Sequence, residues 1–286
     1  MSIGKIAEPS TGPGVLEVSA AGASADVHDC ARRGALIINA DDWGRDRNTT
    51  DRILDCVLCA TVSSVSGMVF MEDSERAAAT ARQHNVSTGL HLNFTTPFSG
   101  TGVSPKLAEH QRRLTQHLRR NRFAPVLYRP ALGVSFEYVV KAQLDEFRRL
   151  YGAGPERIDG HHHMHLCANV VFGNLLPKGT IVRRNFSFRA GEKGLANRLY
   201  RDLIDRVIRR RHDTTDYMFA LPPLSPSHRL QRIFALAEQF AVELETHPVD
   251  PAEYRYLIEG EVLRQAGGVP ITPNYALCCR RFGAAA

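Results

Sequence analysis

The stretch Ala35-Leu-Ile-Ile-Asn-Ala-Asp-Asp-Trp-Gly44 predicts a buried strand that delivers two acidic side chains to one edge of an α/β fold. Its apolar first half fits a strand over residues 35–39, and Asp41 and Asp42 follow directly. Two neighbouring carboxylates repel each other unless a cation lies beside them. The stretch therefore also predicts a positively charged partner for this acid pair.

Downstream of residue 34, short apolar runs alternate with helical patterns, which is typical of βαβ units and a parallel sheet. The segment 97–135 contains proline, glycine and basic residues, and we expect it to be an excursion from the core rather than a core layer. Several strands end in polar, chemically capable residues, and in a β/α barrel these strand ends form the active-site face. The expected strands are 35–39, 65–70, 87–92, 156–159, 180–183 and 241–246, and the expected helices are 48–59, 74–84, 136–151, 194–211 and 229–240.

The composition suits a protein with a substantial core. The chain has 286 residues, 43% of them hydrophobic, and a formal net charge of +6. Its arginines are spread along the sequence, so we interpret them as solvated helix faces and expect no nucleic-acid partner. Residues 1–33 are rich in Gly, Ala, Ser and Pro and predict a disordered N-terminal extension, which leaves residues 34–286 as one domain.

Other features indicate a cytoplasmic protein. No apolar run approaches the roughly 18–20 residues that a membrane span needs, and the first residues show no secretory signal. We expect the cysteines to be reduced thiols, because Cys56 and Cys59 form a CxxC in mid-helix and the adjacent Cys278 and Cys279 are poorly placed to pair with each other. The other two cysteines are Cys30 and Cys167.

Histidines supply the cation-binding chemistry that the acid pair calls for. His91 ends a strand in Gly-Leu-His-Leu-Asn, and the run Asp-Gly-His-His-His-Met-His covers residues 159–165. Asp42, His91 and His161 would provide one carboxylate and two imidazoles from three strand ends, a set that suits zinc and also accepts nickel, cobalt or manganese. Asp41 would then be free to accept a proton from a metal-bound water.

Structural explanations compete with this hypothesis. An Asp-Asp pair after a strand is as often a helix N-cap as a catalytic pair, and a lone histidine such as His91 is more often a hydrogen-bonded core residue. Spacing alone leaves open which histidine of the cluster binds metal. On a strand, His161, His163 and His165 would share one face and His162 would point away.

Four motifs together resemble the YdjC-like carbohydrate deacetylases, a family that includes the chitooligosaccharide and hopanoid-biosynthesis deacetylases. The resemblance runs from about residue 35 to the C-terminus. It implies a distorted (β/α) barrel and metal-dependent removal of an N-acetyl group from an amino sugar. The motifs are Asn39-Ala-Asp-Asp-Trp-Gly44, Gly89-Leu-His-Leu-Asn-Phe-Thr95, Ile158-Asp-Gly-His-His-His-Met-His165 and Glu245-Thr-His-Pro248.

The resemblance implies a role for individual residues. Asp42, His91 and His161 would bind the metal and Asp41 would be the general base. His247 would protonate the leaving amine or stabilise the oxyanion.

Three further residues would contact the substrate. Arg183 resembles a position that faces the sugar, and His163 is a second candidate. Trp43 stands where Phe is usual in the family and would stack on a pyranose ring.

We therefore expect a hydrolase that uses one divalent metal ion, zinc before magnesium, nickel, cobalt or manganese, on an N-acetylated amino sugar. Metal-dependent hydrolysis of another amide or an ester is the alternative. A non-catalytic binder of nucleic acid or another anionic polymer is the third hypothesis. The sequence leaves a homodimer open.

Overall fold

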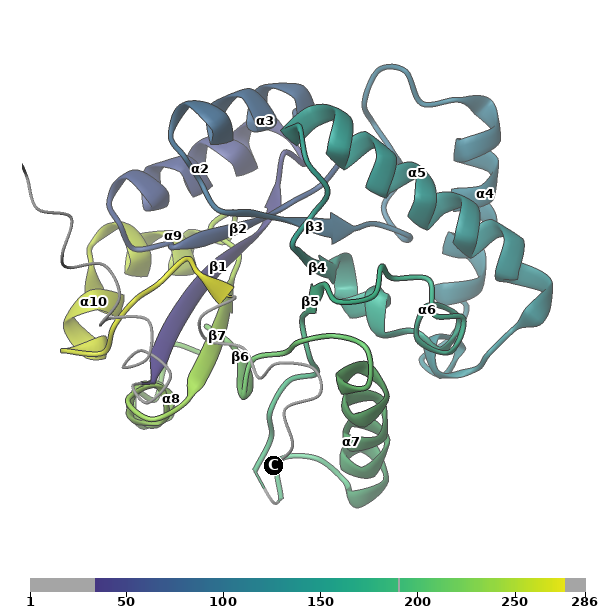
Figure 1. Ribbon diagram of the computed structural model, residues 1–286. Coiled ribbons are helices and arrows are strands. Elements are labelled where there is room, and N and C mark those ends of the chain that lie inside the picture. The colour runs from purple at the N-terminus through teal and green to yellow at the C-terminus, as the bar shows by residue number, and fades with distance from the viewer. Residues whose placement is uncertain (1–33, 190, 276–286) are drawn as a thin grey trace, which may run out of the picture.

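A computed structural model describes residues 34–189 and 191–275, and within them seven parallel strands form one curled sheet (Figure 1). The order of the strands is β5-β4-β3-β2-β1-β7-β6, so β1 lies near the centre. The predicted N-terminal extension and Cys30, Cys278 and Cys279 lie outside the described residues. The strands are β1 (Ala35–Trp43), β2 (Ser64–Gly67), β3 (Thr88–Leu92), β4 (Arg157–Gly160), β5 (Ile181–Val182), β6 (Tyr217–Ala220) and β7 (Ala241–Thr246).

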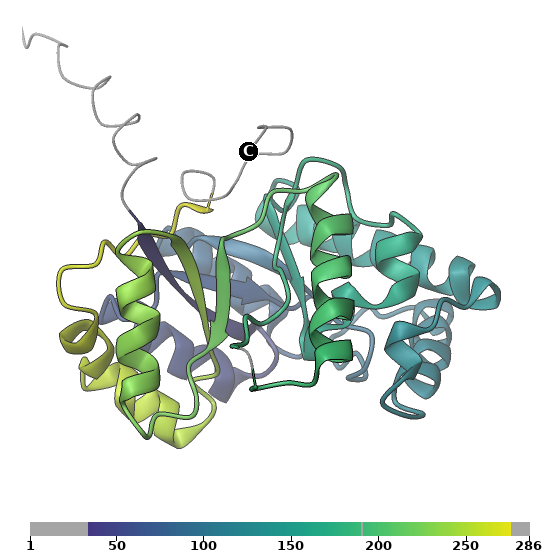
Figure 2. The same cartoon turned by 90° about the horizontal axis from the view of Figure 1, so that it is seen from below.

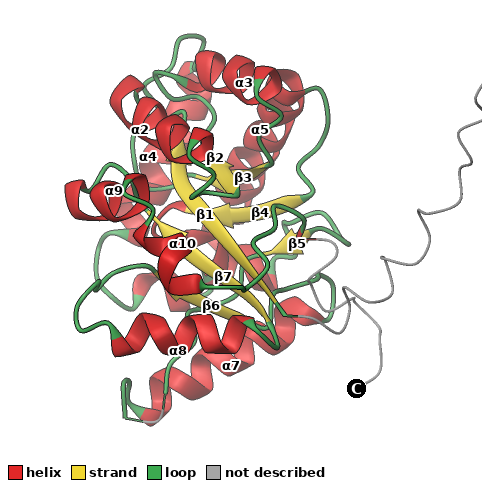
Figure 3. Cartoon of the chain, turned by 90° about the vertical axis from the view of Figure 1, so that its left-hand side faces the viewer, coloured by secondary structure: helices red, strands yellow, loops and turns green. Residues whose placement is uncertain are grey.

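Helices cover the outside of the sheet (Figure 2 and Figure 3). One apolar core lies between the sheet and α2, α8, α9 and α10, and a second lies beneath α4, α5, α6 and α7. None of the described helices is both long and apolar enough to cross a membrane. The helices are α2 (Arg47–Leu58), α3 (Ser74–Gln83), α4 (Pro105–Leu118), α5 (Gly133–Tyr151), α6 (Ala168–Phe172), α7 (Leu195–Arg209), α8 (His228–Ala237), α9 (Pro251–Ile258) and α10 (Glu261–Ala266), with short 3₁₀ helices η2 (Ala124–Val126), η3 (Pro130–Leu132) and η4 (His161–Leu166).

The sheet curls into a half-barrel, which confirms the predicted α/β fold with a distorted barrel. In the part of the chain that the structure describes, its two edges approach each other through isolated contacts. Ile181 forms a single parallel bridge with Asp213, and the amide of Ser187 donates to the carbonyl of Met218 over 2.8 Å. All strands are parallel, so their carboxyl ends gather at one end of the half-barrel.

The structure differs from the expected secondary structure in one long segment and in several short elements. The segment 97–135 contains α4, which buries Leu107, Leu114 and Leu118 in the second core and is capped by the side chain of Ser104. The spacing of these leucines matches one face of a helix, and this periodicity outweighs the basic residues between them. The strand β6 and the helices α6, α9 and α10 were not predicted, and each has eight residues or fewer, too few to show a clear period.

The glycine of the Gly-Leu-His motif has a packing role. Arg157, on β4, is buried, and its guanidinium lies across Gly89 of β3. A Cβ atom at position 89 would lie 2.5 Å from Cζ of Arg157. The guanidinium also donates to Ser64 and Ser66 of β2, so it has little freedom to move aside.

We predict that Gly89→Ala destabilises the protein by about 1–3 kcal/mol, the usual cost of overfilling a packed interior. Denaturant unfolding followed by circular dichroism measures this loss. Gly133→Ala is the matched control, because Gly133 opens α5 and a Cβ there meets nothing within 4 Å. Equal stability of the two variants would contradict the packing role of Gly89.

Candidate metal centre and active site

An irregularity in β1 brings both acids of the opening motif to the same site. Successive side chains of a regular strand point to opposite faces. Here the register of β1 shifts between Ala40 and Trp43, and Asp42 has a φ of +68°, in the left-handed region. Such a residue costs about 1–3 kcal/mol, and this kind of strain clusters at functional sites. As a result, Asp41 and Asp42 both approach His91.

The predicted metal ligands form one compact group. Asp42 Oδ1 lies 2.8 Å from His161 Nδ1 and 3.4 Å from His91 Nε2. These side chains come from β1, β3 and the start of η4, and their ligand atoms all lie within 4.8 Å of one another. All three are buried.

The chemistry of these atoms fits a cation. Asp42 Oδ1 and His91 Nε2 are buried and make no well-directed hydrogen bond among the described residues, since the 2.8 Å contact of Oδ1 with His161 Nδ1 lacks hydrogen-bond angles. Buried polar atoms without partners are rare in proteins and need an explanation. A divalent ion bound by one carboxylate oxygen and two imidazole nitrogens would supply the missing partner.

A buried carboxylate also stands behind the ring of His91. His91 Nδ1 lies 2.7 Å from Asp159 Oδ1, which orients the ring so that Nε2 faces Asp42. The other oxygen of Asp159 accepts from Ser66 Oγ over 2.6 Å and pairs with Arg157. A carboxylate behind a histidine ligand is the usual arrangement at zinc sites.

Two other groups of acids and histidines are less suited to a metal ion. Asp41 with His91 and Asp159, and Asp41 with Glu245 and His247, have the required spacing. In both groups, however, the carboxylates already contact the guanidinium of Arg183. Among the described residues, the Asp42 group has no buried guanidinium beside it, although Asp42 Oδ2 pairs with the half-exposed Arg45 over 3.0 Å.

Electrostatics in the site favour the ionised form of Asp42 and the protonated form of His91. Burial acts to raise the pKa of Asp42, but the imidazoles of His161 and His91 outweigh it and hold this pKa well below its usual range. Burial likewise acts to lower the pKa of His91, whereas Asp41 and Asp159 raise it to about 10. A metal ion at Nε2 of His91 must therefore displace a proton.

Asp41 is held by a buried arginine. Its two oxygens accept from the terminal nitrogens of Arg183 over 2.7 and 2.8 Å, and Asn39 Nδ2 donates to Oδ1 over 2.8 Å. Burial acts to raise the pKa of Asp41, but Arg183 and His91 outweigh it and lower this pKa. Asp41 Oδ2 lies 3.9 Å from His91 Nε2, so an ionised carboxylate stands beside the candidate metal position.

The histidine cluster does not continue the strand that precedes it. Residues His161–Leu166 form η4, and His162 and His163 both have left-handed φ angles, of 55° and 56°. The turn sends each ring to a different partner. His161 faces Asp42, His162 Nδ1 lies 2.9 Å from Thr95 Oγ1, and His165 Nε2 donates to the carbonyl of Arg183 over 2.9 Å.

His163 and His247 meet at Glu245, the last acid of β7. His163 Nε2 lies 3.3 Å from Glu245 Oε2, and its ring packs edge-on against Phe186. His247 Nε2 lies 3.9 Å from Glu245 Oε1, and its side chain is 36% exposed. Both predicted residues thus lie next to the metal group and are partly open to solvent.

Two predicted substrate contacts do not fit the structure. Trp43 has no exposed surface and its Nε1 donates to the carbonyl of Ala77, so the indole is part of the core and is not available to stack on a sugar. Arg183 is 1% exposed and is surrounded by carboxylates, so it acts on Asp41 rather than on a substrate. In both cases the side chain points into the interior of the protein and not toward solvent at the carboxyl end of the strand.

Sequence reasoning missed the acids that organise the site. Asp159, Glu243 and Glu245 are buried and contact Arg183, and Asp159 also orients His91. A signal was present in Ala241–Thr246, where an acid occupies alternate positions of a wholly buried strand. Acids are almost never fully buried unless they are paired, so this pattern indicates a buried cation inside the barrel.

Comparison with known proteins agrees with the motifs. Residues 35–265 match the family profile described as YdjC-like protein. A carbohydrate deacetylase of Mus musculus is 34% identical over 152 residues, which cover 50% of this chain and 47% of that protein. A chitooligosaccharide deacetylase of Serratia marcescens is 32% identical over 132 residues, which cover 46% of this chain and 50% of that protein. The chain spans about half the length of the relatives it matches.

The fold also has a relative among solved structures. A crystal structure from Enterococcus faecalis V583, of a protein named for cellobiose-phosphate cleavage, superposes with a TM-score of 0.58. The match covers 84% of this chain and 98% of that one, at 16% sequence identity, and so shows a shared fold alone. The match to the family profile extends over most of the sequence, from the first strand to α10. The chain belongs to the YdjC-like protein family.

Proposed function

We propose that this protein is a metal-dependent hydrolase that removes the N-acetyl group from an amino sugar. The observation that carries the proposal is the buried group of Asp42, His91 and His161 with the ionised Asp41 beside it. The names of the relatives from Mus musculus and Serratia marcescens support a carbohydrate amide as the substrate. We favour zinc, although nickel, cobalt, manganese and magnesium are compatible with such a site.

Each residue of the site has a defined task in this reaction. Asp42, His91 and His161 would hold a divalent ion, which would supply Lewis-acid chemistry to the acetyl carbonyl and to the attacking water. Asp41 would accept the proton of that water, and Arg183 keeps Asp41 ionised and oriented. The water oxygen adds to the carbonyl carbon, the C–N bond breaks, and acetate and a free amino sugar result. His247, which is partly exposed, donates a proton to the leaving amine.

The proposed ligands make a direct prediction about metal content. We expect Asp42→Ala, His91→Ala and His161→Ala to lose the stoichiometric metal ion, because each removes one of three ligands. Elemental analysis after dialysis against Zn²⁺ measures this. His84→Ala is the control, since His84 is exposed at the end of α3. Full metal content in all three ligand variants would contradict the assignment.

The affinity for metal should rise with pH. His91 binds a proton up to a pKa of about 10 and must release it to coordinate a metal ion. Below that pKa the apparent affinity for Zn²⁺ should increase by about tenfold per pH unit. Isothermal titration in two buffers of different ionisation enthalpy measures the proton that is released. Binding without proton release would mean that His91 is not a ligand.

Asp41→Asn should separate metal binding from catalysis. The amide cannot accept the proton, so kcat should fall by about 10²–10⁴-fold while metal content is retained. Acetate release from a panel of N-acetylated amino sugars gives the rate, and Asp51→Asn, on an exposed part of α2, is the control. Full activity of Asp41→Asn would refute the general-base role. Activity of the wild-type protein on other acyl compounds alone would shift the substrate to another amide or an ester.

A further inference from the structure

The last described residues of the chain close the amino end of the half-barrel. The segment after α10 lies beside β1, where the amide of Leu36 donates to the carbonyl of Pro270 over 2.9 Å and the amide of Thr272 donates to the carbonyl of Leu36 over 3.0 Å. Ser87 Oγ donates to the carbonyl of Pro273. These bonds fix the segment and direct Tyr275 toward the strand ends opposite the metal group.

Tyr275 is buried there against charged and apolar neighbours. Its side chain is 5% exposed and packs with Ile37 of β1 and Ile181 of β5. The centroid of its ring lies 4.6 Å from Cζ of Arg157, which is a cation–π contact. The hydroxyl of Tyr275 has no hydrogen-bond partner among the described residues, so the ring and not the hydroxyl makes the specific contact.

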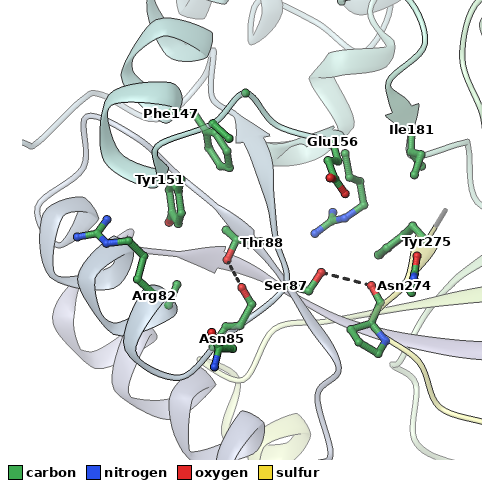
Figure 4. A pocket seen from close by; sticks show the side chains of 16 residues that line it. Arg82, Asn85, Ser87, Thr88, Phe147, Tyr151, Glu156, Ile181, Asn274 and Tyr275 are labelled. Carbon is green, nitrogen blue, oxygen red and sulfur yellow. Dashed lines mark hydrogen bonds between the residues drawn. The ribbon is translucent and has the colours of Figure 1, made fainter. Parts of the chain in front are cut away.

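A cavity of about 500 Å³ lies directly beside this contact (Figure 4). Tyr275, Asn274 and Glu156 form one of its sides, and Phe147 and Tyr151 form another. Arg157 also lines the cavity, although only 3% of its surface is exposed. The Tyr275 ring therefore covers a guanidinium that would otherwise face the cavity and its water.

Arg157 links this end of the barrel to the metal group. Its Nη1 donates to Asp159 Oδ2, and Asp159 Oδ1 lies 2.7 Å from His91 Nδ1. Only two side chains thus separate Tyr275 from a proposed metal ligand. An ion pair is stronger in a dry interior than in water. The series of contacts from Arg157 through Asp159 to His91 therefore depends on the exclusion of water from Arg157.

From this geometry we infer that Tyr275 is a positioning residue for the metal centre. Its ring keeps Arg157 dry and in place, Arg157 holds Asp159, and Asp159 orients His91. The inference rests on the proposed metal site. It assigns a task to the last described residues, at the amino end of the half-barrel, where no substrate is expected.

The test measures Zn²⁺ affinity of the full-length protein by competition with a chromophoric chelator. We expect Tyr275→Ala to bind Zn²⁺ about tenfold more weakly, which is typical of a lost outer-shell partner. Tyr275→Phe keeps the ring and loses only an unpaired hydroxyl, so its affinity should stay within about twofold of wild type. Tyr275→Leu retains apolar volume without a π face and should fall between them.

Tyr256→Ala is the matched control. Tyr256 packs against the core between the sheet and α2, α8, α9 and α10, and among the described residues its hydroxyl also lacks a partner. Unchanged affinity in Tyr275→Ala overturns the inference, and so does an equal loss in Tyr256→Ala, which would indicate general destabilisation. If Tyr275→Ala does not fold, the same comparison is made between Tyr275→Leu and Tyr275→Phe, and equal affinities overturn the inference. A wild-type protein that binds no Zn²⁺ would instead contradict the proposed function.

Discussion

The guanidinium of Arg183 is the group on which the site depends. It lies wholly inside the half-barrel and contacts carboxylates from three strands: Asp41 of β1, Asp159 of β4, and Glu243 and Glu245 of β7. An arginine buried without partners would cost several kcal/mol, so these contacts are necessary for the fold as well as for the site. The rigid planar fork of the guanidinium holds Asp41 through both oxygens, which fixes the carboxylate more firmly than a single contact would.

The buried carboxylates around Arg183 outnumber the buried guanidiniums. Among the described residues, Asp41, Asp42, Asp159, Glu243 and Glu245 are buried near two buried guanidiniums, those of Arg157 and Arg183. Part of this excess of negative charge is relieved at Glu243, because burial raises the pKa of Glu243 despite the opposing effect of Arg183. At Asp42 the compensating charge comes from the imidazoles, of which His91 has its pKa raised to about 10, and from the half-exposed Arg45. A divalent ion bound at that point would take over the charge of the proton that His91 releases.

The sequence predicted the fold, and that Asp42, His91 and His161 lie together, because both depend on local patterns. Apolar runs alternating with helical periods predict a parallel sheet whose strand ends gather at one edge, and the family resemblance selects His161 from its cluster. The sequence could not show which side chains turn inward. Trp43 and Arg183 were expected at the substrate but are buried, and the pairing of Arg183 with Glu243 joins positions 60 residues apart. Contacts of that kind arise only when the sheet curls.

The η4 turn shows why such a dense histidine cluster can be divided among several tasks. On a strand, alternate histidines would project from one face and compete for the same position. Left-handed backbone at His162 and His163 instead turns each ring in a different direction, toward Asp42, Thr95, Glu245 or the backbone of Arg183. Two such residues in succession cost free energy that only surrounding contacts can offset. His165 provides one of those contacts, because its buried ring packs against Gly160 and hydrogen-bonds to the residue that holds Asp41. The geometry of the proposed metal ligands and the orientation of the proposed base therefore depend on the same turn.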